Sequence, residues 1–190
     1  MTDLFFLHIP KTGGTSFRAA CELLGIPSYH CYLTEVPPGF RVITLLREPL
    51  ARCLSHYNHA WSHWTKERNG EHYEWLHRTQ PGPIEFYERG LPWVDYNLQT
   101  SLLGGLAGLN SLWWFGLTER YEDSLKDLGK RLGVVLPLLR ANVGEKRLER
   151  FTPEERRHFT DHCRDDLGLH HEARRVLTHG NGSSESDLGR

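Results

Sequence analysis

Two short segments of this 190-residue chain combine residue types that bind anions. The first, Pro10-Lys11-Thr12-Gly13-Gly14-Thr15-Ser16, directly follows the apolar run 4–9. Its two glycines let the backbone wrap closely around an anion, its three hydroxyls add donors, and Lys11 adds a mobile positive charge. A phosphate-like ligand is therefore expected. The segment is not a Walker A loop, G-x-x-x-x-G-K-[ST], because Lys11 precedes the glycines; an ordinary glycine turn with an exposed lysine is the alternative.

The second segment has the pattern Arg47-x-Pro49-x-x-Arg52-x-x-Ser55. Arg47 ends the β-rich run 41–46, and Pro49 is typical of the first residue of a helix. Arg52 and Ser55 are three residues apart, on one face of that helix. The segment can thus present a guanidinium and a hydroxyl to a second anion beside a helix N-terminus. The alternatives are a structural salt bridge for Arg52 and a plain surface role for Ser55.

The elements around both segments alternate between strand and helix. Apolar runs predict buried strands at 4–9, 41–46 and 112–117. Periodicity and helix breakers predict the helices, at about 15–24, 49–66, 83–89, 96–103 and 121–132, with a C-terminal one opening at Thr152-Pro153. The polar stretch 67–82 reads as a surface excursion. This alternation indicates an α/β fold with a parallel sheet in three layers, in which ligands collect at the carboxyl ends of the strands.

Composition excludes several classes of protein. With 23 Lys+Arg against 24 Asp+Glu, the net charge of -1 gives no bias toward nucleic acid or acidic membranes. We expect no secretory signal, and the longest apolar stretch, 102–117, is shorter than the ~20 residues that span a bilayer. Four separated cysteines without a C-x-x-C pair favour reduced thiols. We expect a cytoplasmic protein with one domain, 1–178, and a flexible tail, 179–190.

The two segments together resemble the motifs of sulfotransferases that use 3′-phosphoadenosine 5′-phosphosulfate (PAPS), in the branch that includes the heparan sulfate 2-O-sulfotransferases. Residues 6–16 are similar to the 5′-phosphosulfate loop of that family, and residues 42–55 to its 3′-phosphate motif. Two weaker blocks, 97–104 and 116–125, follow in the same order. The resemblance covers roughly residues 4–175 and implies a three-layer, P-loop-like fold.

The resemblance also implies roles for individual residues. Lys11 would contact the bridging oxygen of the phosphosulfate, and Arg47 and Ser55 would hold the 3′-phosphate. The 5′-phosphate would be held by the backbone amides of Thr12, Gly13, Gly14, Thr15 and Ser16. The implied reaction is in-line transfer of a sulfuryl group from PAPS to an acceptor hydroxyl, without a metal. A cation and N–H donors suit this chemistry because negative charge builds on the leaving phosphate oxygen.

A base must also remove the proton of the acceptor hydroxyl. The related 2-O-sulfotransferases carry a histidine in a short segment before the second core strand, and His30 occupies that place here. Imidazole has the pKa that suits this task near neutral pH. The relatives have a second histidine two residues later, where this chain has Tyr32. His8, beside the anion loop, is the competing base, unless it is a packed histidine of the strand.

Three further groups of residues have open roles. Three histidines near one face of the second helix could ligate a metal, pack, or face the acceptor: His56, His59 and His63. Four tryptophans could stack on the acceptor or on adenine, or pack in the core: Trp61, Trp64, Trp75 and Trp93. Two cations could close over the 3′-phosphate or remain solvated: Lys146 and Arg147.

The sequence therefore predicts a PAPS-dependent sulfotransferase. The acceptor stays open among saccharides, lipid headgroups and small natural products, with neither nucleic acid nor a membrane anchor involved. A small-molecule kinase of P-loop type is the rival enzyme; it is disfavoured by the missing Walker order and by a second anion motif that a kinase does not need. A catalytically idle nucleotide-binding or interaction protein is the rival of another class.

Overall fold

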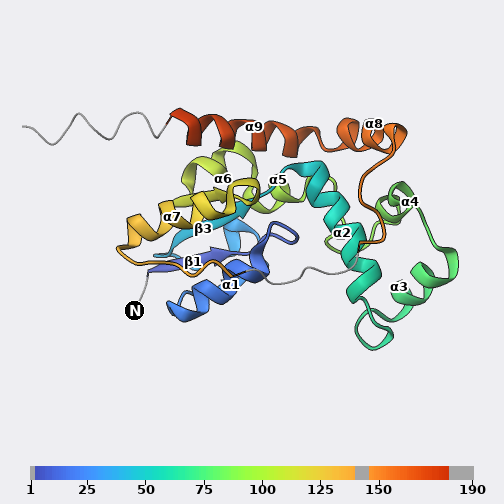
Figure 1. Ribbon diagram of the computed structural model, residues 1–190, viewed down its shortest axis with the longest axis horizontal. Coiled ribbons are helices and arrows are strands. Elements are labelled where there is room, and N and C mark those ends of the chain that lie inside the picture. The colour runs from blue at the N-terminus through green and yellow to red at the C-terminus, as the bar shows by residue number, and fades with distance from the viewer. Residues whose placement is uncertain (1–2, 140–145, 180–190) are drawn as a thin grey trace, which may run out of the picture.

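The fold is built on a small parallel β-sheet. The computed structural model describes residues 3–139 and 146–179. Four strands in these ranges, β1 (Leu4–Leu7), β2 (Ser28–Tyr29), β3 (Arg41–Leu46) and β4 (Trp114–Leu117), form an all-parallel sheet in the order β2-β1-β3-β4 (Figure 1). This confirms the predicted α/β fold with a parallel sheet.

The strand register brings the carboxyl ends of the three longer strands to one edge. Leu7 of β1 lies opposite Thr44 of β3, and Leu46 lies opposite Leu117 of β4. The Thr44 hydroxyl also donates to the Leu7 carbonyl at 2.7 Å. The loops that follow β1, β3 and β4 therefore leave the sheet side by side.

Helices cover both faces of this sheet, because alternate strand residues point to opposite sides. On one face, Phe5, Leu7 and Val42 pack against α5 (Leu98–Leu103), α6 (Gly105–Ser111) and α9 (Arg164–His179). On the other face, Phe6 and Ile43 pack against α1 (Gly14–Leu23) and α7 (Tyr121–Leu132).

The remaining helices form a second apolar cluster around α2 (Pro49–His63). It includes α4 (Pro83–Glu88) and α8 (Pro153–His162), with Phe86, Tyr87 and Phe159 buried between them. In Figure 1, α2, α3 (Lys66–Thr79) and α4 lie beyond one end of the sheet, while α9 runs along one side of the molecule. Two short 3₁₀ helices complete the fold, at Leu33–Glu35 and Thr118–Arg120.

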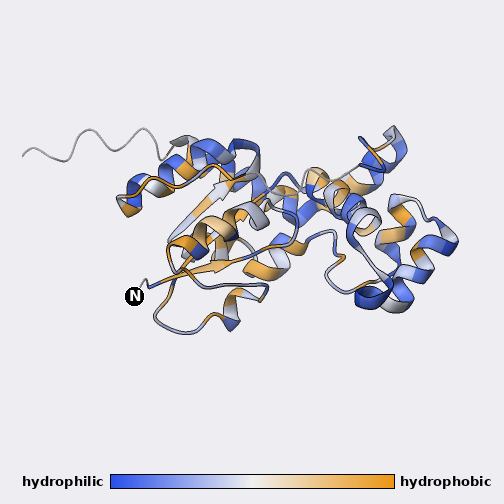
Figure 2. Ribbon diagram, turned by 60° about the horizontal axis from the view of Figure 1, so that its bottom comes forward, coloured by the Kyte–Doolittle hydropathy of each residue, from blue (hydrophilic) through white to orange (hydrophobic). Residues whose placement is uncertain are grey.

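The structure corrects some of the predicted elements. The stretch 67–82, expected to be an excursion, is mostly α3, interrupted at Gly70, where φ is +48°. Its surface is largely hydrophilic (Figure 2), which hid the helix, but Leu76 is fully buried in the second cluster and anchors it. The preceding helix ends at His63 instead of near residue 66. Strand β2 and helix α6 were not predicted.

Two further expectations concern the C-terminal tail and membrane-spanning segments. Helix α9 continues to His179, and the rest of the expected tail, 180–190, lies outside the described residues. None of the described helices is long and apolar enough to cross a membrane.

Candidate active site

The loop after β1 has the backbone shape of an anion cradle. Lys11 and Gly13 both adopt left-handed conformations, with φ of +68° and +80°. Helix α1 begins directly afterwards at Gly14, so the amides of Gly14 and Thr15 have no acceptor within the helix and can point toward an anion. The Thr12 hydroxyl donates to the Ile9 carbonyl at 2.9 Å and closes the turn. That hydroxyl is therefore structural and is not available to an anion.

Close packing explains why the loop contains two glycines. A Cβ added to Gly14 would lie 2.0 Å from Cδ2 of the His8 ring, well inside van der Waals contact. At Gly13, a Cβ would approach Cγ2 of Thr118 to 3.3 Å, in a backbone conformation that other residues rarely adopt. The packing of His8 thus requires glycine at position 14, and the left-handed backbone favours glycine at position 13.

The loop after β3 meets the first loop through Arg47. Its Nη1 donates to the Lys11 carbonyl at 3.1 Å, so Arg47 lies directly beside the first loop. Burial lowers the pKa of Arg47, whereas Glu119 and Glu48 raise it. Arg47 still keeps its charge, because the ordinary pKa of arginine lies far above neutrality.

Helix α2 presents Ser55 but not Arg52 on its accessible side. Ser55 is half-buried, and its hydroxyl makes no hydrogen bond within the described parts of the chain. Arg52 is fully buried; its Nη2 donates to the carbonyls of Asp95 (2.6 Å) and Tyr96 (2.9 Å), and its Nε lies 3.6 Å from Asp166. Arg52 therefore has the structural role that the sequence left open.

The N-terminus of α2 is already occupied by a carboxylate. The side chain of Glu48 accepts a hydrogen bond from the amide of Ala51 at 2.7 Å. An anion near α2 would consequently depend on the side chains of Arg47 and Ser55 more than on free helix amides.

Gln99 holds the backbone of Arg47 from both sides, a role that sequence reasoning missed. Its Oε1 accepts from the Arg47 amide at 2.8 Å, and its Nε2 donates to the Arg47 carbonyl at 2.9 Å. Asp166 accepts from the amides of Gln99 (3.2 Å) and Thr100 (2.7 Å) and lies beside Arg52. Gln99, Asp166 and Arg52 are all fully buried, so Arg47 rests on a buried polar network. The only sequence signal was the weak block at 97–104.

Thr118, at the end of β4, joins the two loops. Its Oγ1 lies 2.5 Å from the Thr12 carbonyl and 2.9 Å from the Leu46 carbonyl, and its single proton can be donated to either. The next residue, Glu119, accepts a hydrogen bond from the amide of Glu48. The end of β4 thus fixes the position of both anion-binding segments.

The side chain of Lys11 has a pKa close to neutral pH. Burial, and secondarily the nearby charge of Arg47, lower the pKa of Lys11 to about 8. A bound dianion would counteract both effects, because it favours the charged form of the amine. The two neighbouring cations, Lys11 and Arg47, therefore favour the binding of an anion at this site.

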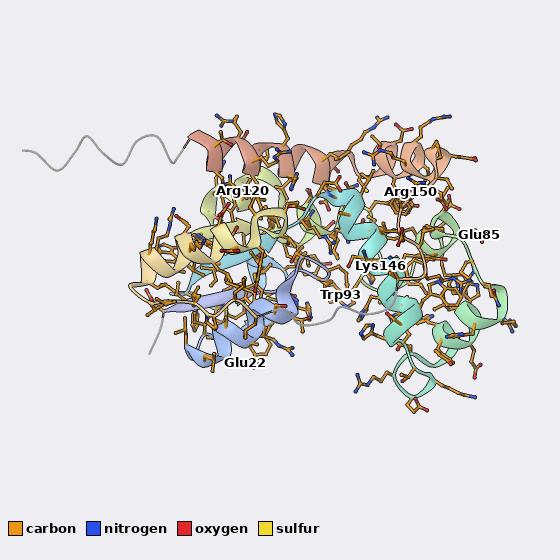
Figure 3. The ribbon with its side chains drawn as sticks, viewed as in Figure 1. Glu22, Glu85, Trp93, Arg120, Lys146 and Arg150 are labelled. Carbon is orange, nitrogen blue, oxygen red and sulfur yellow. The ribbon has the colours of Figure 1, made fainter. Side chains whose placement is uncertain are left out.

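A cleft of about 470 Å³ opens beside Lys11. Histidines contribute a large part of its wall: His8, His30, His56, His59 and His72. Thr15, Trp64, Arg68 and Asn69 also line the cleft, and Trp93, labelled in Figure 3, lies there with 44% of its surface exposed. This is a pocket of a size suited to a small ligand or to part of a larger one.

The two candidate bases have different environments. His30 is exposed, and its Nδ1 lies 2.6 Å from the carbonyl oxygen of His8. Since a carbonyl can only accept, Nδ1 carries the proton and Nε2 keeps its lone pair, which is the tautomer that a base requires. His8 is buried against Phe6 and His30, and burial is the main cause that lowers its pKa to about 3. The geometry therefore favours His30 over His8 as a base.

The remaining candidates divide between the cleft and other parts of the molecule. Trp64 and Trp93 line the cleft, whereas Trp61 lies under the guanidinium of Arg147 at 3.5 Å and Trp75 under that of Arg89 at 5.3 Å. Arg147 is thus engaged with α2.

The three histidines of α2 do not converge on one point. His59 stacks on His63 with ring centroids 4.4 Å apart, while His56 is buried among aromatic rings of α4. Among residues 3–139 and 146–179, no group of three or more His, Cys, Asp or Glu side chains is arranged to hold a metal ion.

A comparison of the chain with models of protein families finds no match, and a comparison with curated proteins finds none either.

Proposed function

We propose that this protein is a PAPS-dependent sulfotransferase with a P-loop-like fold. The observation that carries the proposal is the junction of two anion-binding segments at one edge of the sheet, where Arg47 donates to the carbonyl of Lys11. One segment offers helix amides and a lysine, and the other offers a guanidinium and a hydroxyl. A nucleotide with phosphates at both its 5′ and 3′ positions would use both segments.

Different residues bind the nucleotide, stabilise the leaving group and accept the proton. The amides of residues 12–16 hold the 5′-phosphate, and Arg47 and Ser55 hold the 3′-phosphate. In the transfer, the bond from sulfur to the bridging oxygen breaks as the acceptor oxygen bonds to sulfur. Lys11 stabilises the charge that develops on the leaving phosphate oxygen. The acceptor proton passes to Nε2 of His30, whose Nδ1 is held by the His8 carbonyl.

A nucleotide panel separates this proposal from the rival kinase. Adenosine 3′,5′-bisphosphate should raise the melting temperature more than ATP or 5′-AMP at equal concentration, because only this nucleotide engages Arg47 through a 3′-phosphate. Stabilisation by ATP alone would favour a kinase and overturn the assignment.

A transfer assay separates an enzyme from an idle binding protein. The protein is incubated with PAPS labelled in its sulfate and with panels of saccharides, lipid headgroups and small natural products. We expect label to pass to members of one panel. Binding of adenosine 3′,5′-bisphosphate without transfer to any acceptor would favour the idle nucleotide-binding protein.

A further inference from the structure

We propose that His56 binds the sulfuryl group itself, donating the hydrogen on its Nε2 to a non-bridging sulfuryl oxygen. The inference rests on the proposed function and adds a group that the sequence motifs do not contain.

His56 lines the cleft beside the anion loop. It lies in α2 and is only 6% exposed, yet it shares the cleft wall with Lys11 and His59. The rings of Phe86 and Tyr87 in α4 pack edge-on against it, with centroids 6.1 and 6.3 Å away. The imidazole is thus held in one orientation at the edge of the site.

The surroundings of the two ring nitrogens indicate which one carries the proton of His56. Nδ1 is buried and has no hydrogen-bond partner within the described parts of the chain, so Nε2 is the nitrogen that can face the cleft. An unpaired buried N–H is rarer in folded proteins than an under-satisfied acceptor. The proton therefore belongs on Nε2, where a ligand in the cleft can accept from it.

Burial, together with nearby positive charge, keeps the ring of His56 neutral. Burial is the largest cause that lowers its pKa to about 3, followed by the charges of Arg52, Lys11 and His59. From α4, Tyr87 is the titratable group that faces it, and burial raises the pKa of that phenol well above its usual range. His56 is therefore a neutral donor throughout the pH range of most enzymes and a poor candidate for the base.

A neutral donor at this position matches the chemistry of a sulfuryl group. The non-bridging oxygens carry no hydrogens, so they can only accept hydrogen bonds. His56 and Lys11 line the same cleft, so the donor shares the pocket with the cation proposed for the bridging oxygen. During transfer, His56 gains and loses no proton, and the acceptor proton still goes to His30.

The decisive measurement compares PAPS with adenosine 3′,5′-bisphosphate, two ligands that differ by the sulfuryl group. Calorimetry gives both affinities for the parent and for His56→Phe, which keeps a ring against α4 but removes the donor. We expect the variant to lose about five- to tenfold in affinity for PAPS, the scale of one hydrogen bond, with little change for the bisphosphate. His56→Gln, which can retain an N–H donor, should recover most of the loss.

Matched controls separate the possible outcomes. His63→Phe makes the same change seven residues further along α2. His63 is exposed and does not line the cleft, so this variant should leave both affinities unchanged. An unchanged ratio of the two affinities in His56→Phe would overturn the role of His56 alone. Failure of the parent protein to bind either nucleotide would overturn the proposed function instead.

A second readout does not depend on whether the variant folds. In the parent protein labelled with ¹⁵N-histidine, NMR should show the Nε2–H tautomer of His56 between pH 6 and 8, with a shift of that nitrogen on adding PAPS that exceeds the shift from the bisphosphate. A proton on Nδ1, a charged ring, or equal shifts from the two ligands would contradict the inference.

Discussion

The titration of Lys11 links the structure to a measurable pH dependence of nucleotide binding. In the free protein, burial and Arg47 lower the pKa of this amine to about 8. A bound phosphate favours the charged amine, so the pKa rises in the complex and binding takes up a proton. The sign is therefore fixed: affinity for adenosine 3′,5′-bisphosphate falls as pH rises through 8.

The magnitude follows from the fraction of charged Lys11. With a pKa of about 8, that fraction is roughly 90% at pH 7 and roughly 10% at pH 9, so affinity should fall about tenfold, or about 1.4 kcal/mol. The phosphates of the ligand do not mask the effect, because with a second pKa of about 6 they are already roughly 90% ionised at pH 7 and change little above it.

Calorimetry at pH 7, 8 and 9 measures the affinity, and repeating the titration at pH 8 in buffers of different ionisation enthalpy measures the proton uptake. Lys11→Gln is the control: it should bind more weakly, with an affinity that stays nearly constant between pH 7 and 9. A parent protein whose affinity changes less than twofold, or a Lys11→Gln variant with the full slope, would refute the reasoning.

Four further predictions test the rest of the site. Arg47→Ala should weaken adenosine 3′,5′-bisphosphate at least tenfold in calorimetry while leaving 5′-AMP nearly unchanged; equal losses would place Arg47 on the 5′ side. Gln99→Leu should cost about 2–4 kcal/mol in the free energy of unfolding, measured with urea, because it leaves the amide and carbonyl of Arg47 unpaired, and an unchanged stability would argue against the network. Gly14→Ala should abolish nucleotide binding because of the overlap with His8, and His8→Ala in the same chain should restore part of it; no recovery would mean that another contact excludes the Cβ. In single-turnover transfer, the rate should rise with pH through a pKa below the ordinary 6.5 of histidine, since burial lowers the pKa of His30, and His30→Ala should flatten this limb whereas His8→Ala should not.

The local parts of the fold could be predicted from the sequence. Strand β3 at 41–46 and helix α7 at 121–132 have the expected bounds, because apolar runs and helical periodicity act over a few neighbouring residues. Pro49 and Pro153 begin helices as predicted, since proline fits the first turn, where no intrahelical amide bond is lost. The turn at Lys11 to Gly13 was likewise readable from its glycines.

Partners that are distant in the sequence were decided by the tertiary structure. Arg52 and Ser55 share a helix, but α9 and the segment 95–96 bury Arg52 beside Asp166, which lies 114 positions further along, whereas Ser55 stays half-buried. The sequence favoured His30 as the base and kept His8 as its competitor; the hydrogen bond to the carbonyl of His8, which sets the tautomer of His30, is visible only in the structure. The sequence alone determined which chemical groups are present and which local turns hold them; only the packing of strands and helices determined which groups face one another, because a hydrogen bond or a pKa shift depends on distance in space.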